Sequence, residues 1–175
     1  MSFPDTTDYL KYGTSSQRGA FATLEKYKIL KVLAEFDPVL VGTIPLDINI
    51  PGSDLDIACE CKDLEVFKEI VTRHFSHLPA FSVVIKLVNN VPTMLSHFQA
   101  DSFPIEIFAQ DVPVRHQFGY LHMVKEYEIL EHEGAAFKEQ IILLKKSGIK
   151  TEPAFAKILN LDGDPYLSLL KYNLQ

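Results

Sequence analysis

Two aspartates, Asp54 and Asp56, stand two residues apart in the strand-like run VGTIPLDINIPGSDLDIAC, residues 41–59 of the 175-residue chain. Side chains alternate between the two faces of a strand, so both carboxylates point to one side while Leu55 and Ile57 point to the other. Two like charges about 4 Å apart repel by roughly 4 kcal/mol at an effective dielectric constant of about 20. The pair therefore requires water or a cation beside it.

A third acid stands in a matching context, because Glu106 is flanked by Ile105 and Ile107 in the run FPIEIFAQ. If its strand pairs with the strand of the two aspartates, three carboxylates converge. Such a group suits hard divalent cations that prefer oxygen ligands, chiefly Mg²⁺ with Mn²⁺ as an alternative. The predicted chemistry is two-metal phosphoryl transfer, in which one ion activates an attacking hydroxyl and the other holds the phosphates.

The segment before the aspartates has features that suit a phosphate. A strand that ends at Gly42 and Thr43 leaves backbone N–H groups and a hydroxyl at a turn, and glycine permits a close approach of phosphate oxygens. Pro51 and Gly52 then turn the chain back and leave Ser53 beside the acid pair.

Together these residues resemble the signature of the polymerase-beta type nucleotidyltransferase superfamily: a Gly-Gly or Gly-Ser pair, a short interval, an acid–hydrophobic–acid strand and a third acid on a later strand. More narrowly, the phrases GTIPLDINIPGSDLDI, LLKKSGIKTEPAFAKIL and GDPY are similar to a small bacterial family of unknown function with a nucleotidyltransferase-like fold. The resemblance covers most of the chain. It implies that Asp54 and Asp56 bind both metal ions and that Glu106 serves the catalytic ion and the acceptor hydroxyl.

For the nucleotide, the resemblance implies that Gly42, Thr43 and Ser53 contact the triphosphate. Two departures from the family pattern bear on this expectation. Thr43 replaces the usual Ser, and the loop lacks the Arg that small bacterial members often carry soon after it. A metal ion or a cation from elsewhere must therefore meet the phosphate charge. The candidate cations are Lys86, Arg115, His116 and Lys150.

The overall composition narrows the partners. The formal net charge is −6, from 17 Lys and Arg against 23 Asp and Glu. This balance disfavours wide contact with a nucleic-acid backbone or an anionic membrane, which basic residues drive. It favours a nucleoside triphosphate with a small, neutral or cationic hydroxyl-bearing acceptor. No apolar run approaches the roughly 20 residues that span a bilayer, and the first residues lack a signal-peptide pattern, which predicts a cytoplasmic protein.

The periodicities predict a single nucleotidyltransferase-like domain over residues 1–175, with a soft boundary near 112 between a sheet core (1–112) that carries the acids and a helical C-terminal part (113–175). The expected class is α+β, with a mixed, largely antiparallel sheet of about five strands covered by helices. The expected helices begin at Ser15 or Ser16 (running to Phe36), at Asp63, near Arg115, and at the caps Thr151 and Asp164; the expected strands are 39–42, the aspartate strand, 81–88, 94–99 and 105–109, and residues 100–104 form a hairpin turn longer than two residues.

Two further groups of residues are expected to have structural roles. Cys59 and Cys61 lie on the face opposite the aspartates and are predicted to be buried, reduced thiols rather than zinc ligands. The acids Glu126, Glu128, Glu131 and Glu133 are predicted to form a solvated helical face.

Three functions remain open on the sequence alone. The first is a Mg²⁺-dependent nucleotidyltransferase that moves a nucleoside monophosphate to a hydroxyl of a small acceptor. The second is a non-catalytic nucleotide-binding or regulatory module of the same fold, such as a toxin–antitoxin type partner, which the missing loop Arg favours. The third is a structural protein whose three acids do not converge. An exposed apolar stripe in the C-terminal third would suit a homodimer.

Overall fold

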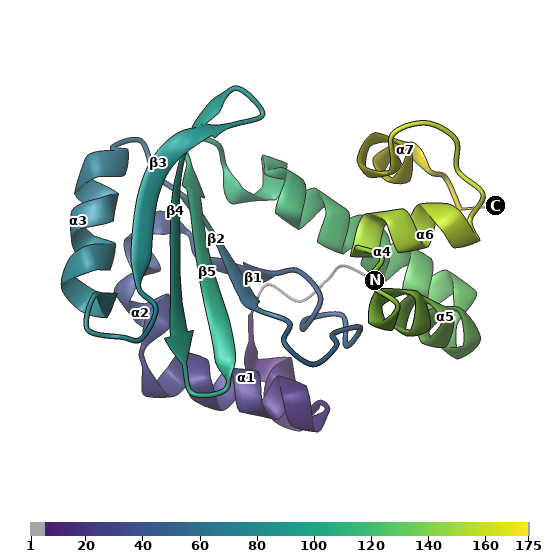
Figure 1. Cartoon of the computed structure of the whole chain (residues 1–175), viewed down its shortest axis with the longest axis horizontal. Helices are drawn as coiled ribbons and strands as arrows, with labels where there is room; N and C mark the ends of the chain where they lie inside the picture. Colours follow the sequence, from purple (N-terminus) through teal and green to yellow (C-terminus); the bar gives the residue numbers. More distant parts are fainter. Residues whose placement is uncertain (1–5, 175) are drawn as a thin grey trace.

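The computed structural model describes residues 6–174, and the strands in that range form one five-stranded mixed sheet in the order β1-β2-β5-β4-β3 (Figure 1). The strands are β1 (Val39–Val41), β2 (Leu55–Glu60), β3 (Ser82–Val88), β4 (Val91–Ala100) and β5 (Phe103–Gln110). β2 and β5 are parallel, and the other neighbours are antiparallel. The predicted α+β class with a largely antiparallel sheet is confirmed.

Helices cover the two faces of the sheet unequally. The helices are α1 (Ser15–Lys26), α2 (Ile29–Val32), α3 (Leu64–Phe75), α4 (Phe118–Glu133), α5 (Ala135–Lys146), α6 (Thr151–Ile158) and α7 (Pro165–Lys171). Figure 1 shows α1, α2 and α3 beside the sheet and α4 to α7 gathered at the other side of the molecule. No helix in the described range is long and apolar enough to cross a lipid bilayer.

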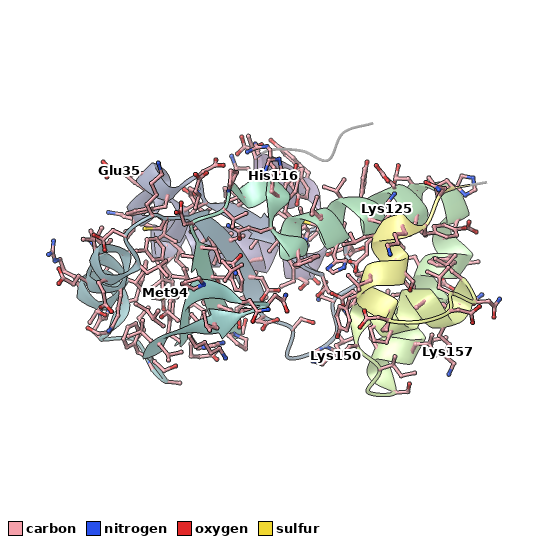
Figure 2. All side chains as sticks on the ribbon, turned by 90° about the horizontal axis from the view of Figure 1, so that it is seen from above. Glu35, Met94, His116, Lys125, Lys150 and Lys157 are labelled. Carbon is pink, nitrogen blue, oxygen red and sulfur yellow. The ribbon has the colours of Figure 1, made fainter. Side chains whose placement is uncertain are left out.

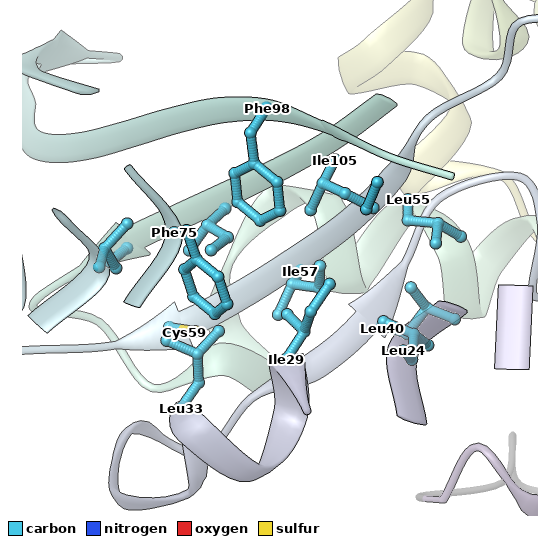
Figure 3. Packing of buried hydrophobic residues seen from close by; sticks show 14 of the residues in the cluster. Leu24, Ile29, Leu33, Leu40, Leu55, Ile57, Cys59, Phe75, Phe98 and Ile105 are labelled. Atoms are coloured by element: carbon cyan, nitrogen blue, oxygen red, sulfur yellow. The ribbon is translucent and has the colours of Figure 1, made fainter. Parts of the chain in front are cut away.

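The alternation of side chains along β2 and β5 separates two hydrophobic clusters. Leu55, Ile57 and Cys59 of β2 pack with α1, α2 and α3 in the first cluster, where Phe75 and Phe98 stack with ring centroids 4.9 Å apart (Figure 3). The second cluster joins sheet residues such as Val41 and Ala58 to the helices α4 to α7. The face of β2 that carries the acids is therefore the face that meets the C-terminal helices.

The prediction of one long N-terminal helix that runs to Phe36 is wrong, because the helix ends at Lys26. Thr14, rather than Ser15 or Ser16, caps α1 through a capping box with Gln17. Lys28 then adopts a left-handed conformation (φ 54°), which lets α2 start in a new direction. Ile29 and Leu33 are fully buried after this break, so tertiary burial overrides the continuous helical periodicity.

The hairpin turn between β4 and β5 is tighter than expected. Ala100 pairs with Phe103, so Asp101 and Ser102 alone connect β4 to β5. Asp101 has a φ of 50°, which short polar residues tolerate in tight turns. The Asp101 carboxylate also accepts a hydrogen bond of 2.5 Å from Lys26 Nζ of α1 and one of 3.1 Å from the hydroxyl of Tyr27, the residue that follows α1. The sequence thus predicted the hairpin turn but not its two-residue length, and contacts with residues distant in sequence support it.

Of the three other expected helix caps, two are present. The Asp63 side chain accepts from Val66 N at the start of α3, and Asp164 accepts from two backbone N–H groups at the start of α7. Thr151 is instead the first residue of α6, whose N-cap is Lys150, without a side-chain cap bond. The predicted state of the two cysteines is confirmed, since Cys59 and Cys61 are buried and free.

Candidate functional site

The parallel pairing of β2 with β5 determines where the acids meet. Asp56 lies directly opposite Glu106 in this ladder, with no strand between them. Asp54 immediately precedes β2. All three side chains line one cavity of about 350 Å³ between the sheet and the C-terminal helices. Residues 50 positions apart in sequence are therefore brought to a common wall, which we call the strand wall.

The turn after β1 is shaped around Asp56. Gly42 has a φ of 82°. A Cβ atom at this position would collide with Asp56 Oδ2. Glycine is therefore required both for the backbone conformation and for the space that the carboxylate occupies. Thr43 lines the same cavity beside the acids.

Ser53 is placed differently from the other residues expected to contact nucleotide. Its Oγ accepts a hydrogen bond of 3.0 Å from Ile50 N, which closes the Pro51-Gly52 turn. It lines an adjoining cavity of about 380 Å³, which also reaches Thr43 and Asp54. Ser53 therefore lines the adjoining cavity and not the cavity that the strand wall lines.

Burial and like charge act together on Asp56. Burial, and after it the charges of Asp54 and Glu106, raise the pKa of its carboxyl to about 8, while the charge of Lys145 acts to lower it. An acid with such a pKa holds a proton at neutral pH unless a cation comes close. The strand wall is thus electrostatically suited to a positive ion.

Glu106 has a partner on the next strand. His97 of β4 lies opposite Glu106 in the antiparallel register, and His97 Nε2 is 2.6 Å from Glu106 Oε2. The imidazole must donate in this contact, because an ionised carboxylate only accepts. This hydrogen bond fixes one oxygen of the Glu106 carboxylate, and the side chain also lines the cavity.

The opposite side of the cavity carries charged groups that the sequence did not reveal. Glu126 of α4 is only 3% exposed, so its assignment to a solvated helical face is wrong. Burial, and after it the charge of Glu152, raises the pKa of Glu126 well above its ordinary range. Lys145 of α5 is 6% exposed, and burial lowers its pKa to about 8 while the charges of Glu126 and Glu152 act to raise it. We call Glu126, Lys145 and Glu152 the helix wall.

The cations proposed for the phosphates can now be placed. Lys145 and Lys150 both line the adjoining cavity with Thr43 and Ser53. Figure 2 labels Lys150 at the junction of the sheet and the C-terminal helices. Among the other candidates, Arg115 pairs with Asp37 at 3.2 Å, and Lys86 and His116 are exposed residues that line none of the cavities described here. Lys145 was missed because it follows two isoleucines and two leucines in the last turn of a helix, where a lysine is typical of a favourable charge at the helix end.

The donor groups of the strand wall can be compared with the needs of a metal ion. Within residues 6–174, no three His, Cys, Asp or Glu side chains stand close enough to hold one ion together. Mg²⁺ is usually bound through one or two carboxylates, with water and substrate phosphates completing its shell, rather than by an all-protein cage. The oxygen donors of Asp54 and Asp56, kept close to the turn by Gly42, fit that mode.

A larger cavity of about 950 Å³ continues from the first one past Glu106. The two share the side chains of Phe108, His122 and Glu152. Phe118 and Tyr166 add aromatic rings, with the His122 ring 6.0 Å from each. The site thus has one end that carries Lys145, a central acidic wall and an aromatic end, and Lys150 lines the cavities at both ends.

Comparisons with known proteins place this geometry in a wider context. The family model described as a domain of unknown function, DUF4269, matches residues 22–172. A comparison with curated proteins gave no match.

Solved structures of similar fold are nucleotidyltransferases. The chain resembles the Cid1 poly(U) polymerase with bound MgGTP (TM-score 0.52, 13% identity, 79% of this chain and 42% of that one). It also resembles a chain of the GLD-2/RNP-8 complex (0.55, 15%, 87% and 60%) and a chain of the polymerase core of TRAMP, an RNA surveillance complex (0.51, 14%, 93% and 51%). The chain therefore spans roughly half the length of these structures. Identities this low establish the nucleotidyltransferase-like fold alone.

Proposed function

This chain belongs to DUF4269, a family described as a domain of unknown function, and we propose that it is a nucleotidyltransferase that moves a nucleoside monophosphate from a nucleoside triphosphate to a hydroxyl of a small acceptor. One observation carries the proposal. The parallel register sets Asp56 opposite Glu106, and these two acids with Asp54 line a cavity that adjoins the one lined by Lys145 and Lys150.

The residues divide the substrate between the cavities. The triphosphate lies toward Thr43 and Ser53, where Lys145 and Lys150 offset its charge in place of the missing loop Arg. Asp54 and Asp56 would hold Mg²⁺, or Mn²⁺, between the phosphates and the acceptor. When bound there, such an ion makes the acceptor hydroxyl more acidic and neutralises phosphate charge.

The reaction follows from that placement. The acceptor oxygen forms a bond to the α-phosphorus, the bond between that phosphorus and the bridging oxygen of the β-phosphate breaks, and pyrophosphate leaves. Glu106, held by His97, stands at the border with the larger cavity and is placed to take the hydroxyl proton. The acceptor then lies in the larger cavity.

The nature of the acceptor follows from the charges around the larger cavity. Glu106, Glu152 and Asp164 line it against one cation, Lys150. A polyanionic acceptor such as an RNA end would be repelled there, whereas a small neutral or cationic molecule would not. The similar polymerase core of TRAMP, in contrast, belongs to an RNA surveillance complex.

The test begins with binding. Melting curves of the native chain with Mg²⁺ and each of the four ribonucleoside triphosphates should show a rise in melting temperature, because a ligand of the folded state stabilises it by mass action. An Asp54→Asn, Asp56→Asn double variant should show a much smaller Mg²⁺-dependent rise. Absence of any shift in the native chain contradicts the proposal.

The second step of the test separates transfer from binding. Labelled triphosphates incubated with a small-metabolite extract and Mg²⁺ should yield a labelled product that the double variant does not form. Nucleotide binding with no product that depends on the aspartates would instead support a non-catalytic, regulatory role of the same site.

A further inference from the structure

The hydrogen bonds of His122 define its free nitrogen. His122 Nε2 lies 3.0 Å from the carbonyl oxygen of Tyr166. A carbonyl only accepts, so Nε2 carries the hydrogen, and in the neutral ring Nδ1 is then an acceptor. The ring is held in this orientation by Phe118 and Tyr166, each with its centroid 6.0 Å from that of the imidazole.

A second acceptor faces this nitrogen. Glu152 Oε1 lies 3.7 Å from His122 Nδ1, which is too far for a hydrogen bond. Both side chains are largely buried, at 9% and 22% exposure. Both line the first cavity and the larger one, so the space between the two acceptors opens into the site. Two acceptors this close are both satisfied when a donor with two hydrogens bridges them from the side of the cavity.

The same cavity holds a further unpaired acceptor. Gln117 is 3% exposed, and its Nε2 donates to two backbone carbonyls, Cys59 O and Val112 O, at 2.8 Å each. These bonds fix the amide and leave Oε1 as the one fully buried side-chain polar atom without a partner in residues 6–174. Native proteins pair nearly all such atoms, so a missing donor at this cavity indicates a ligand or a water that supplies it.

We propose that His122 Nδ1 and Glu152 Oε1 form a recognition site for an amino group of the molecule held in this pair of cavities. An –NH₂ or –NH₃⁺ group can donate one hydrogen to each acceptor at once. A hydroxyl has one hydrogen and can satisfy only one of them, and a carbonyl oxygen is repelled by both. The carboxylate adds a charge-assisted bond, which is stronger than one between neutral groups.

The identity of the molecule rests on the proposed function. Under it, the amino group has two sources: the exocyclic amine of the nucleobase, or an amine of the acceptor. Both present the same donor chemistry to Nδ1 and Oε1. The experiment below therefore has one arm for each source.

The probe variant is Glu152→Gln, which keeps the shape, removes the charge and directs an amide hydrogen toward Nδ1. Its matched control is Glu139→Gln, an exposed position on α5 outside these cavities. In the nucleotide arm, calorimetry compares CTP with UTP and ATP with ITP in the presence of Mg²⁺, since each pair differs by an amino group replaced with a carbonyl. In the acceptor arm, it compares D-glucosamine with D-glucose.

The expected result is a preference of about tenfold or more for the amino-bearing member in one arm, the size of one lost charged hydrogen bond. Glu152→Gln should reduce that preference, taken as the ratio of the two dissociation constants, to less than about threefold. Glu139→Gln should keep it. No preference in either arm, or a preference that Glu152→Gln leaves intact, overturns the inference.

The outcomes separate this inference from the proposed function. Nucleotide binding without amino preference in either arm defeats the amino-group site and leaves the transferase proposal standing. Amine binding that depends on Glu152, with no binding of any triphosphate, supports the amino-group site and defeats the transferase proposal. A nitrogen-15 spectrum of the histidines near neutral pH, with His122→Gln used to assign the signal, should show Nε2 protonated and Nδ1 bare. Protonation of both nitrogens would make the pair an ion pair and overturn the inference directly.

Discussion

Glu126 and Glu152 of the helix wall line the same cavity as the strand wall, and Lys145 lines the adjoining one. The two walls handle their charges differently. Asp54, Asp56 and Glu106 place three acids together without a cation of their own, and Asp54 is exposed to solvent. The helix wall sets Lys145 near Glu126 and Glu152, and Lys145 and Glu126 are more buried than any acid of the strand wall. One wall therefore depends on a positive charge from outside, and the other carries its own.

This difference gives the two walls separate roles. An uncompensated acid cluster lowers the stability of the empty protein, and such strain is expected where a cation is bound during function. A buried, internally compensated group gains little from an added ion, and breaking it by removing one partner is costly. Substitutions should therefore affect activity most at the strand wall and folding most at the charge balance of the helix wall.

The largest expected effect is on transfer. Asp54→Asn or Asp56→Asn should lower the rate of Mg²⁺-dependent transfer by about a thousandfold or more, because each removes a charge that the reaction needs. Glu126→Gln is the matched change on the helix wall and should lower it by less than about tenfold. Equal losses in single-turnover assays would mean that the two walls do not differ in this way.

Asp56→Asn, which should lower the rate of transfer, should raise the stability of the protein. The pKa of Asp56 is raised from 3.8 to about 8 in the folded protein. Between these values the folded state holds a proton that the unfolded state has lost, so the free energy of unfolding falls as pH rises, by at most about 1.4 kcal/mol per pH unit. Asp56→Asn lacks this loss. Without metal, it should become more stable relative to the native chain from pH 5 to pH 8.

Urea unfolding at several pH values, with EDTA present, measures this difference. Glu60→Gln, another acid of β2 but outside the cavity, serves as the control and should show no such trend. A constant difference between Asp56→Asn and the native chain across the pH range would show that Asp56 is ionised in the empty protein. Added Mg²⁺ should reduce the advantage of the variant, because an ion stabilises only the native carboxylate.

How far the sequence predicts the two walls depends on the element that carries each. Asp54, Asp56 and Glu106 could be placed on one face because strand side chains alternate strictly, so neighbours such as Ile57 and Ile107 reveal the core side. The pairing of β2 with β5 was conditional in the sequence, since no local pattern states which strands are adjacent. The parallel ladder supplied that link.

The helix wall had no comparable signal. Glu126 lies among charged residues on α4, and that composition is typical of a solvated surface. The helices α5 and α7 pack against α4, and such packing depends on contacts between elements rather than on spacing within one. Lys145 likewise looked like a favourable charge at a helix C-terminus. Only the assembled helices show that these two groups offset each other.

Lys145 should matter for folding more than its exposed neighbour. Lys145→Met leaves the charges of Glu126 and Glu152 without compensation and should lower the free energy of unfolding by about 2 kcal/mol near pH 7. Lys146→Met, one residue on and exposed, should change it by less than about 0.5 kcal/mol.

A double variant locates the cause of that loss. Adding Glu126→Gln to Lys145→Met should recover part of the stability, because it removes one of the uncompensated acids. Chemical denaturation of all four chains gives the coupling energy. If the two substitutions are simply additive, Lys145 does not balance Glu126, and the contrast between the walls rests on burial alone.

The smallest effect concerns His97, which lies beside the strand wall and orients Glu106 through the 2.6 Å contact. The pair is half exposed, so its contribution to stability is small. Its contribution to transfer comes from the position of the carboxylate that receives the hydroxyl proton. His97→Ala should lower kcat by about tenfold with little change in the KM for nucleotide, because one positioned proton-transfer group usually contributes at least this much to the rate.

Two control variants test the cause of this loss. His97→Gln keeps a donor and should recover most of the rate, whereas His74→Ala, at an exposed histidine on α3, should have no effect. A loss in His97→Ala that His97→Gln does not rescue would show that the imidazole acts on the site other than by holding Glu106.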